Sequence, residues 1–289
     1  PVEGQNWHTD PFLMTIDGSR IFGRGSCDMK GFIAATLACA PKFAKSPLKR
    51  PVHFAFTYDE EVGCIGGQAL VKEIEKRKIY PAVAIIGEPT QMRIIQGHKG
   101  CYEYSVNFVG VEGHGALPDQ GVNAIEYAVR YVTHLLSLRD ELCKRAPNNS
   151  PFIPPWTTLQ VGRINGGVAR NVIPGSCTID WEMRPVSKND SDFVKLEMKN
   201  HIDNVLKPEM KFQNPAADII TKIIAEVEDF ELVENSEAIQ IISELTGSKC
   251  KDVVSFGTEA GLFQKIGISA VVCGPGSIEQ AHKVDEFIE

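Results

Sequence analysis

The sequence lacks the features that mark several protein classes. No apolar run approaches the roughly 20 residues that a membrane-spanning helix needs, and no signal peptide is visible. Basic residues are in the minority, and the formal net charge of −7 gives no electrostatic reason to bind nucleic acid or an anionic membrane. None of the eight cysteines forms a Cys-x-x-Cys pair, which disfavours a thiolate zinc site and a disulfide framework. We therefore expect a cytoplasmic protein with reduced thiols.

Internal repeats and low-complexity segments are also absent. The 289 residues are 43% hydrophobic and 23% charged, which fits a soluble protein of one large or two medium domains. In the first hundred residues, strand-like runs at 51–58 and 82–86 alternate with helical patterns at 30–45 and 64–78. Pro41 should kink or shorten the first helix. This alternation is typical of an α/β domain.

The pattern changes near residue 100. Strands are expected at 101–110, 157–163 and 176–183, and helices at 122–145 and 190–206. From residue 214 the α/β alternation resumes, with helices at 236–246 and 258–265 and a strand at 268–273. The predicted fold class is therefore α/β. A discontinuous domain of residues 1–100 and 214–289 carries an inserted α+β domain at 101–213.

Four acids and one late histidine stand in loops where apolar runs end: Asp28, Glu60, Glu61, Glu88 and His282. The pair of glutamates follows the expected buried strand 51–58. Carboxylates with a histidine form the ligand set of a hydrolytic zinc or cobalt site. The residues therefore favour a metallohydrolase.

Each of these residues also has an ordinary structural interpretation. Asp28 could be the N-cap of the following helix, and Glu88 could start a helix or occupy a turn. Two glutamates in a loop are commonly solvated, and a lone loop histidine commonly lies at the surface. The joint occurrence at the ends of separate apolar runs is what favours the metal site.

The adjacent glutamates suit two different tasks. Neighbouring side chains of an extended chain point to opposite sides, so Glu60 and Glu61 cannot both face one ion in the same way. One carboxylate can then bind a metal while the other lies beside the water to be activated.

Several strings resemble the M20 metallopeptidase family, in order along essentially the whole chain. They are Asp28-Met29-Lys30-Gly31, Asp59-Glu60-Glu61, Gly87-Glu88-Pro89-Thr90, Gly113-His114-Gly115-Ala116, Phe256-Gly257-Thr258-Glu259 and Gln280-Ala281-His282. The resemblance implies a catalytic metal-binding domain and an inserted lid domain through which two subunits pair as a homodimer. It implies a small N-acyl amino acid as the substrate, with no nucleic-acid or membrane partner.

The resemblance also implies roles for the acids. Asp28 would bridge two divalent metals, which we expect to be zinc, with cobalt as the alternative. Glu61 and His282 would complete one metal site, and Glu88 would serve the other. Glu60 would be the general base that moves a proton from the attacking water to the leaving amine.

One ligand of the family is missing from the printed residues. The family's His-x-Asp motif ends an earlier strand, which we expect to precede Pro1, with this chain an internal portion of a longer protein. The string His8-Thr9-Asp10 imitates the motif but matches a later loop of the family, so we do not expect His8 to be a ligand. With these residues alone we expect weak occupancy of the second metal site and poor activity.

The inserted domain supplies further candidates by resemblance. His114 matches a lid histidine that reaches the partner subunit's site and stabilises the oxyanion. Asn171 and Arg184 match substrate-contacting positions, although an arginine that ends a strand is also typical of a surface ion pair. The backbone around Gly274 and Gly276 could add hydrogen-bond donors.

The tail motifs are most similar to members that deacetylate N2-acetyl-L-ornithine in arginine biosynthesis. A succinyl-diaminopimelate desuccinylase, or another aminoacylase or dipeptidase, would use the same metal core. A catalytically silent fragment is the alternative outside enzymes, because of the absent motif. Thiol chemistry at Cys27 or Cys64 is disfavoured, since neighbouring acids raise a thiol's pKa.

Overall fold

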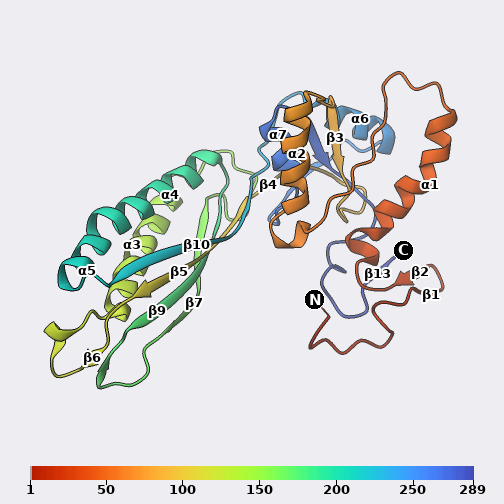
Figure 1. The fold of residues 1–289 in the computed structure, drawn as a ribbon. Helices are drawn as coiled ribbons and strands as arrows, with labels where there is room; N and C mark the ends of the chain where they lie inside the picture. Colours follow the sequence, from red (N-terminus) through yellow and green to blue (C-terminus); the bar gives the residue numbers. More distant parts are fainter. Residues whose placement is uncertain (1) are drawn as a thin grey trace. The chain divides into compact units, whose positions relative to one another are not determined.

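The computed structural model describes residues 2–289, which form two compact units (Figure 1). Unit 1 comprises residues 2–97, 232–254 and 258–289, and unit 2 comprises residues 98–231 and 255–257. Both units combine helices with sheets, as the α/β fold class predicts. Within the described residues, no helix is both long enough and apolar enough to cross a bilayer.

Unit 1 is built on a four-stranded sheet with the order β11-β4-β12-β3. The strands are β3 (Val83–Ile86), β4 (Ile94–His98), β11 (Lys251–Val254) and β12 (Ser269–Val272). Helices α6 (Glu237–Thr246) and α7 (Ala260–Lys265) pack against β3 and β12, and α2 (Ile65–Arg77) packs against α7. Strand β12 runs parallel to β3 and antiparallel to β4. Because β3 and β12 are parallel, their carboxyl ends lead into loops on the same edge of the sheet, the loops of Glu88 and Gly274.

A second, three-stranded sheet joins the two ends of the described chain. Strand β2 (Arg20–Phe22) pairs with both β1 (Thr15–Asp17) and β13 (Phe287–Ile288). Helix α1 (Gly31–Lys45) follows an irregular turn, Ser26–Lys30, and continues through Pro41 without ending. The proline therefore does not shorten the helix. The pairing of β2 with β13 brings the Asp28 turn next to the segment that follows His282.

The prediction of a buried strand at 51–58 is wrong. This segment has no strand assignment, and its large apolar side chains are exposed, Val52 by 47%, Phe54 by 38% and Phe56 by 56%. Apolar character predicts that a segment can be covered, but a strand also requires a neighbouring strand to pair its backbone groups. The described residues provide no such neighbour for this segment.

Unit 2 is a two-layer α+β structure. Its antiparallel sheet has the order β10-β5-β9-β7, formed by β5 (Cys101–Val109), β7 (Thr158–Gly166), β9 (Ser176–Arg184) and β10 (Asp218–Val227). The helices α3 (Ala124–Lys144), α4 (Lys188–His201) and α5 (Lys207–Gln213) lie along one face of this sheet (Figure 1). Alternate residues of β5 and β9 are buried, as expected for strands with one face against a helical layer.

The core of unit 2 is one continuous apolar cluster. It contains Phe108, Tyr131, Leu135 and Ile179, each at most 1% exposed. Helix α3 starts at a capping Asn123, whose Oδ1 accepts from the backbone N–H groups of residues 125 and 126. A small two-stranded sheet of β6 (Gly113–His114) and β8 (Val172–Ile173) also belongs to this unit.

The predicted return to the larger domain at residue 214 is too early. Residues 218–227 form β10, which pairs along β5 from Asp218↔Val109 to Val227↔Cys101. The run from Ile219 to Ile224 belongs to this edge strand of unit 2, so the unit extends to Glu231. The beginning of unit 2, at His98, lies within a few residues of the predicted boundary.

Candidate metal centre

Asp28 lies in the irregular turn between β2 and α1. Its backbone is not helical, with φ −117° and ψ 90°. Helix α1 begins afterwards, with Lys30 at the N-cap position and no side-chain cap. The N-cap interpretation of Asp28 is therefore wrong, and its carboxylate, 18% exposed, is available for another role.

Glu60 and Glu61 occupy a single helical turn, Glu60–Val62, and their side chains diverge. Glu61 points toward His282, whose Nε2 lies 3.0 Å from Oε1 and 3.0 Å from Oε2. Glu60 instead accepts a long hydrogen bond from the Sγ of Cys64, at 3.6 Å. The carboxylate of Glu61 therefore faces the histidine, whereas the carboxylate of Glu60 faces Cys64.

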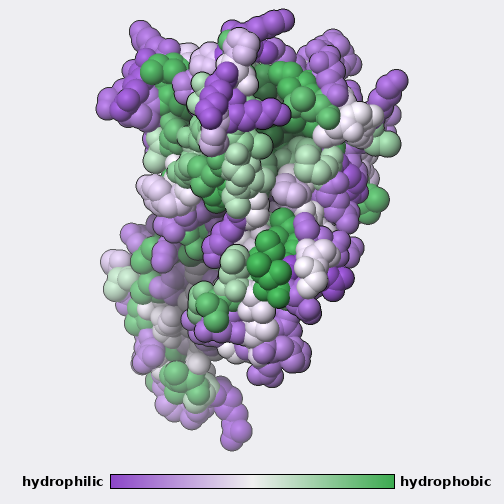
Figure 2. All heavy atoms as spheres, turned by 90° about the vertical axis from the view of Figure 1, so that its right-hand side faces the viewer, coloured by the Kyte–Doolittle hydropathy of each residue, from purple (hydrophilic) through white to green (hydrophobic). Residues whose placement is uncertain are grey.

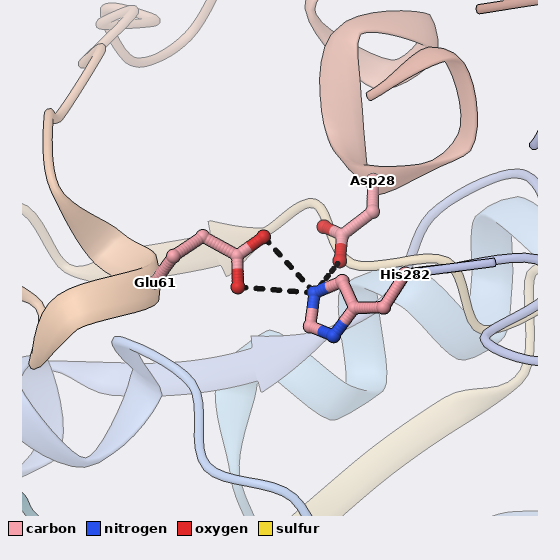
Figure 3. A group of neighbouring side chains, drawn as sticks. All are labelled: Asp28, Glu61 and His282. Carbon is pink, nitrogen blue, oxygen red and sulfur yellow. Dashed lines mark hydrogen bonds and ion pairs between the residues drawn. The ribbon is translucent and has the colours of Figure 1, made fainter. Parts of the chain in front are cut away.

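Asp28, Glu61 and His282 converge on one point (Figure 3). One ligand atom from each lies within 4.8 Å of the others, and Nε2 of His282 is 3.6 Å from Oδ2 of Asp28. Figure 3 shows the imidazole presenting this nitrogen to both carboxylates, with its other nitrogen turned away. Two carboxylates and an imidazole on three separate loops form a donor set that suits a divalent ion such as zinc.

Electrostatic repulsion among the acids also fits a cation. Burial and the charge of Glu61 raise the pKa of Asp28 to about 6. Burial, followed by the charges of Glu61 and Asp28, raises the pKa of Glu60 to about 7. Glu88 is 6% exposed, and burial with the charges of Asp28 and Glu60 raises its pKa well above the usual value. A divalent cation would offset this repulsion and favour the ionised carboxylates.

Glycines allow the chain to approach closely around Glu88. A Cβ on Gly87 would lie 2.1 Å from the ring of Phe32 in α1. A Cβ on Gly274 would lie 2.6 Å from the backbone oxygen of Glu88. The N–H of Gly274 donates to the Thr90 hydroxyl at 3.2 Å, so this group already has an internal acceptor. Gly274 is therefore a close-packed position, and its role as a donor to the substrate stays a prediction.

Gly276 has a related packing role. Its φ of +83° lies in the left-handed region that favours glycine, and a Cβ there would lie 2.6 Å from Sγ of Cys27. Its carbonyl oxygen accepts from the backbone N–H of Gln91 at 2.7 Å.

The candidates of unit 2 fall at two separate places. His114 pairs with Val172 across the β6–β8 sheet, and the N–H of Gly115 donates to the backbone oxygen of Asn171, so His114 and Asn171 lie together and exposed. Arg184 stands at the other end of β9, about 27 Å along the strand from Ser176. Its Nη2 donates to Glu182 at 2.8 Å, which matches the ion-pair alternative for this residue.

The remaining candidates lie outside the three-residue cluster. His8 is exposed, and its Nδ1 pairs with Asp285. Burial and neighbouring acids raise the pKa of both the Cys27 and the Cys64 thiols, and a raised pKa disfavours the reactive thiolate.

Sequence reasoning missed two acids next to the centre, Glu286, which is buried, and Glu259, which is partly buried. Glu259 accepts from the hydroxyl of Thr57 at 3.0 Å, and its charge contributes to the raised pKa of Glu60. Glu286 is 1% exposed and binds the backbone of the Asp28 turn. The one signal in the sequence is position, because each acid stands directly before an apolar run.

Comparisons with known proteins point to one family. All of residues 1–289 match the family described as Peptidase family M20/M25/M40. Acetylornithine deacetylase of Proteus mirabilis is 34% identical over 289 residues, which are 100% of this chain and 72% of that protein. The corresponding enzyme of Shigella sonnei is 32% identical, over 100% of this chain and 73% of its own length.

Solved structures show the same fold. A tripeptidase from Staphylococcus aureus superposes with a TM-score of 0.67 and 18% identity, over 96% of this chain and 70% of that one. An M20 family metallo-carboxypeptidase from Sulfolobus solfataricus gives a TM-score of 0.67 and 19% identity, over 98% and 76%. With its fold, its clustered acids and a match over its full length, the chain belongs to peptidase family M20/M25/M40, a family of metal-dependent hydrolases.

Proposed function

We propose that the chain hydrolyses the acetyl amide of N2-acetyl-L-ornithine to ornithine and acetate. The observation that carries this proposal is the convergence of Asp28, Glu61 and His282, with Glu60 beside them on the same turn as Glu61. The two relatives named above, 32–34% identical, favour acetylornithine as the substrate. Succinyl-diaminopimelate and dipeptides are the competing substrates, because the same acids would serve them.

Asp28, Glu61 and His282 would hold one ion, and Asp28 with Glu88 would hold a second. When bound, the divalent ions would polarise the amide carbonyl and lower the pKa of the attacking water. We expect zinc at these sites, with cobalt as the alternative. Because Asp28 and Glu88 both offer carboxylates to the second ion, with no imidazole from the described residues assigned to it, we expect it to bind more weakly than the first.

Glu60 is the proposed proton carrier. Its carboxylate diverges from Glu61, so it can face the attacking water while its neighbour binds the ion. Glu60 accepts a proton as the water attacks the carbonyl carbon, and it delivers the proton to the leaving amine nitrogen. His114 and Asn171 are the unit 2 residues that we propose for oxyanion and substrate contacts, since both are exposed and adjacent. Arg184 is a weaker candidate, because Glu182 already pairs with its guanidinium.

Acetate release from N2-acetyl-L-ornithine tests the proposed function. We expect the release to require zinc or cobalt, to stop after chelation, and to fall by about 10²–10⁴-fold in Glu60→Gln. The matched control is Glu73→Gln on the exposed face of α2, which should keep full activity. Faster turnover of succinyl-diaminopimelate or a dipeptide would replace the proposed substrate. Full activity of Glu60→Gln would overturn the assigned base.

We further propose that unit 2 mediates a homodimer. Strand β10 is an edge strand of the sheet, and Ile220 and Ile223 on it are 53% and 59% exposed. An unpaired edge with apolar side chains can pair with the same edge of a second copy. Light scattering after size exclusion measures the mass directly, and a monomer at every concentration would contradict this assignment.

A further inference from the structure

One buried acid of unit 1 has no part in the proposed reaction. Glu286 immediately precedes β13, and its side chain is 1% exposed. Each of its carboxylate oxygens accepts two hydrogen bonds. Oε2 accepts from Arg24 Nη1 at 2.9 Å and from the Gly25 N–H at 2.8 Å, and Oε1 accepts from the Cys27 N–H at 2.9 Å and the Asp28 N–H at 3.0 Å.

These bonds fix the backbone of the turn that carries Asp28. Three of the four donors are the backbone N–H groups of Gly25, Cys27 and Asp28, in or next to this turn. The backbone of the turn is irregular, so these groups need acceptors from elsewhere in the chain. The main chain of Glu286 adds to the contact, because its carbonyl oxygen accepts from the Gly23 N–H at 3.0 Å and from the Ser26 hydroxyl at 3.2 Å. A buried carboxylate with four donors and an arginine charge is a stable arrangement, whereas the same turn without it would leave several buried N–H groups unpaired.

Glu286 also belongs to the loop that carries His282. His282 has a φ of 60° and Asp285 a φ of 54°, both in the left-handed region where non-glycine residues are strained. The loop is held from outside as well, because Gln5 Nε2 donates to the His282 carbonyl at 3.1 Å and the His8 N–H donates to Asp285 at 2.9 Å. The end of this loop is anchored by Glu286.

We propose that Glu286 is a positioning residue that sets the separation of Asp28 and His282 by tying the turn of one to the loop of the other. This inference rests on the proposed function, in which both residues bind the first ion. Glu286 itself is not a ligand, because its two oxygens already accept four hydrogen bonds. Its effect on the ion is therefore indirect, through the distance and direction of two donors that approach from different segments.

The test compares Glu286→Gln with wild type and with Glu289→Gln. Glutamine keeps the shape, but its amide nitrogen would face N–H donors in place of an acceptor. Glu289 is the matched control, because it lies three residues further on with 66% of its side chain exposed and pairs with Arg20. Titration of the chelator-treated proteins with zinc by calorimetry gives the affinity of the first ion, and the visible spectrum of added cobalt reports its ligand geometry.

We expect Glu286→Gln to bind the first zinc ion about 10–100-fold more weakly, with an altered cobalt spectrum, and Glu289→Gln to match wild type. Glu286→Asp retains the charge and should recover part of the affinity. Should Glu286→Gln fail to fold, Arg24→Gln removes one donor and leaves the three backbone bonds, and we expect it to weaken zinc binding by a smaller factor.

The outcomes separate the two proposals. A Glu286→Gln protein that melts at a lower temperature without metal, yet binds zinc as tightly as wild type and gives the same cobalt spectrum, would show a purely structural role and overturn the inference. Wild type that binds neither zinc nor cobalt would overturn the metal centre itself, and the positioning role with it.

Discussion

Helix α3 of unit 2 and helix α1 of unit 1 are both rich in apolar residues, but they differ in what covers them. Helix α3 buries seven residues, including Tyr131 and Leu135, against the sheet of its unit. Helix α1 buries none, although its composition is the more apolar of the two. The difference shows that apolar composition predicts a helix that can be covered, while burial depends on which element lies against it.

The uncovered region of unit 1 extends beyond the helix. Phe43 of α1 lies 6.3 Å from Phe54, measured between ring centroids, and the segment 51–58 adds Phe56 and Tyr58, which are 56% and 59% exposed. We refer to Leu37, Phe54, Phe56 and Tyr58 as the α1 face. Figure 2, which views the molecule from the side where α1 lies, shows hydrophobic side chains gathered on its upper surface. In unit 2, by contrast, buried apolar side chains of the sheet and helices form one continuous cluster.

The largest effect expected from this difference is on stability. Leu135→Ala in α3 removes a fully buried side chain and leaves a cavity, so we expect a loss of about 2–5 kcal/mol in the free energy of unfolding. Leu37→Ala makes the same change in α1, where the side chain is 50% exposed, and should cost less than about 0.5 kcal/mol. Urea unfolding followed by circular dichroism measures both. Equal losses for the two variants would contradict the difference in burial.

The same contrast explains which parts of the fold could be predicted. The helix expected at 122–145 is observed at 124–144, and the strand expected at 176–183 is observed at 176–184, because in unit 2 the pattern and the packing agree. The segment 51–58 has an equally clear apolar pattern, but the described residues provide no strand to pair with it. Pairing depends on residues distant in the chain, and a local pattern does not contain them.

The metal centre, too, could be predicted from the sequence only in part. Each candidate could be found locally, since Asp28, Glu61 and His282 all stand in loops at the ends of apolar runs or turns. The approach of Asp28 to His282 depends on how β2 and β13 pair, and the local sequence pattern does not show that pairing. The role of Glu286 was hidden for a further reason, because its partners are mostly backbone N–H groups, which every residue except proline has.

The second-largest expected effect is the dependence of the stability of unit 1 on pH when no metal is bound. In the chelated protein, the folded pKa values of Asp28 and Glu60 are raised to about 6 and about 7, so between about pH 4 and 7 folded unit 1 binds protons that the unfolded chain has released. Its stability therefore falls as pH rises from 5 to 7.5, by on the order of 1–3 kcal/mol. Differential scanning calorimetry in chelator measures this slope, and Leu135→Ala identifies the transition that belongs to unit 2.

Added zinc distinguishes the acids of the metal centre from other buried acids. Asp229 in unit 2 also has a raised pKa, caused mainly by burial and the charge of Glu231, so unit 2 should lose some stability over the same pH range. Zinc should remove the pH slope of unit 1, because it stabilises the ionised carboxylates, and leave that of unit 2 unchanged. The clustering of acids would be contradicted if the stability of unit 1 rose with pH in chelator, or if zinc did not change its dependence on pH.

The smallest effect on stability should come from the α1 face, where a charge can be introduced without disturbing a core. Phe56→Glu places a carboxylate at a position that is already 56% exposed, so the free energy of unfolding should change by less than about 0.5 kcal/mol. Binding of the dye ANS, which reports exposed apolar surface, should fall clearly, because the substitution replaces one of the exposed aromatic rings of the α1 face with a charge.

The matched control for this substitution is Phe212→Glu on α5. Phe212 is 93% exposed in unit 2, and it stands outside the apolar cluster of that unit. Single exposed apolar residues are ordinary on protein surfaces and do not form a patch, so this variant should bind nearly as much ANS as wild type. An equal fall in both variants, or a large loss of stability in Phe56→Glu, would mean that the α1 face is packed in solution and that the two units do not differ in the way that their burial indicates.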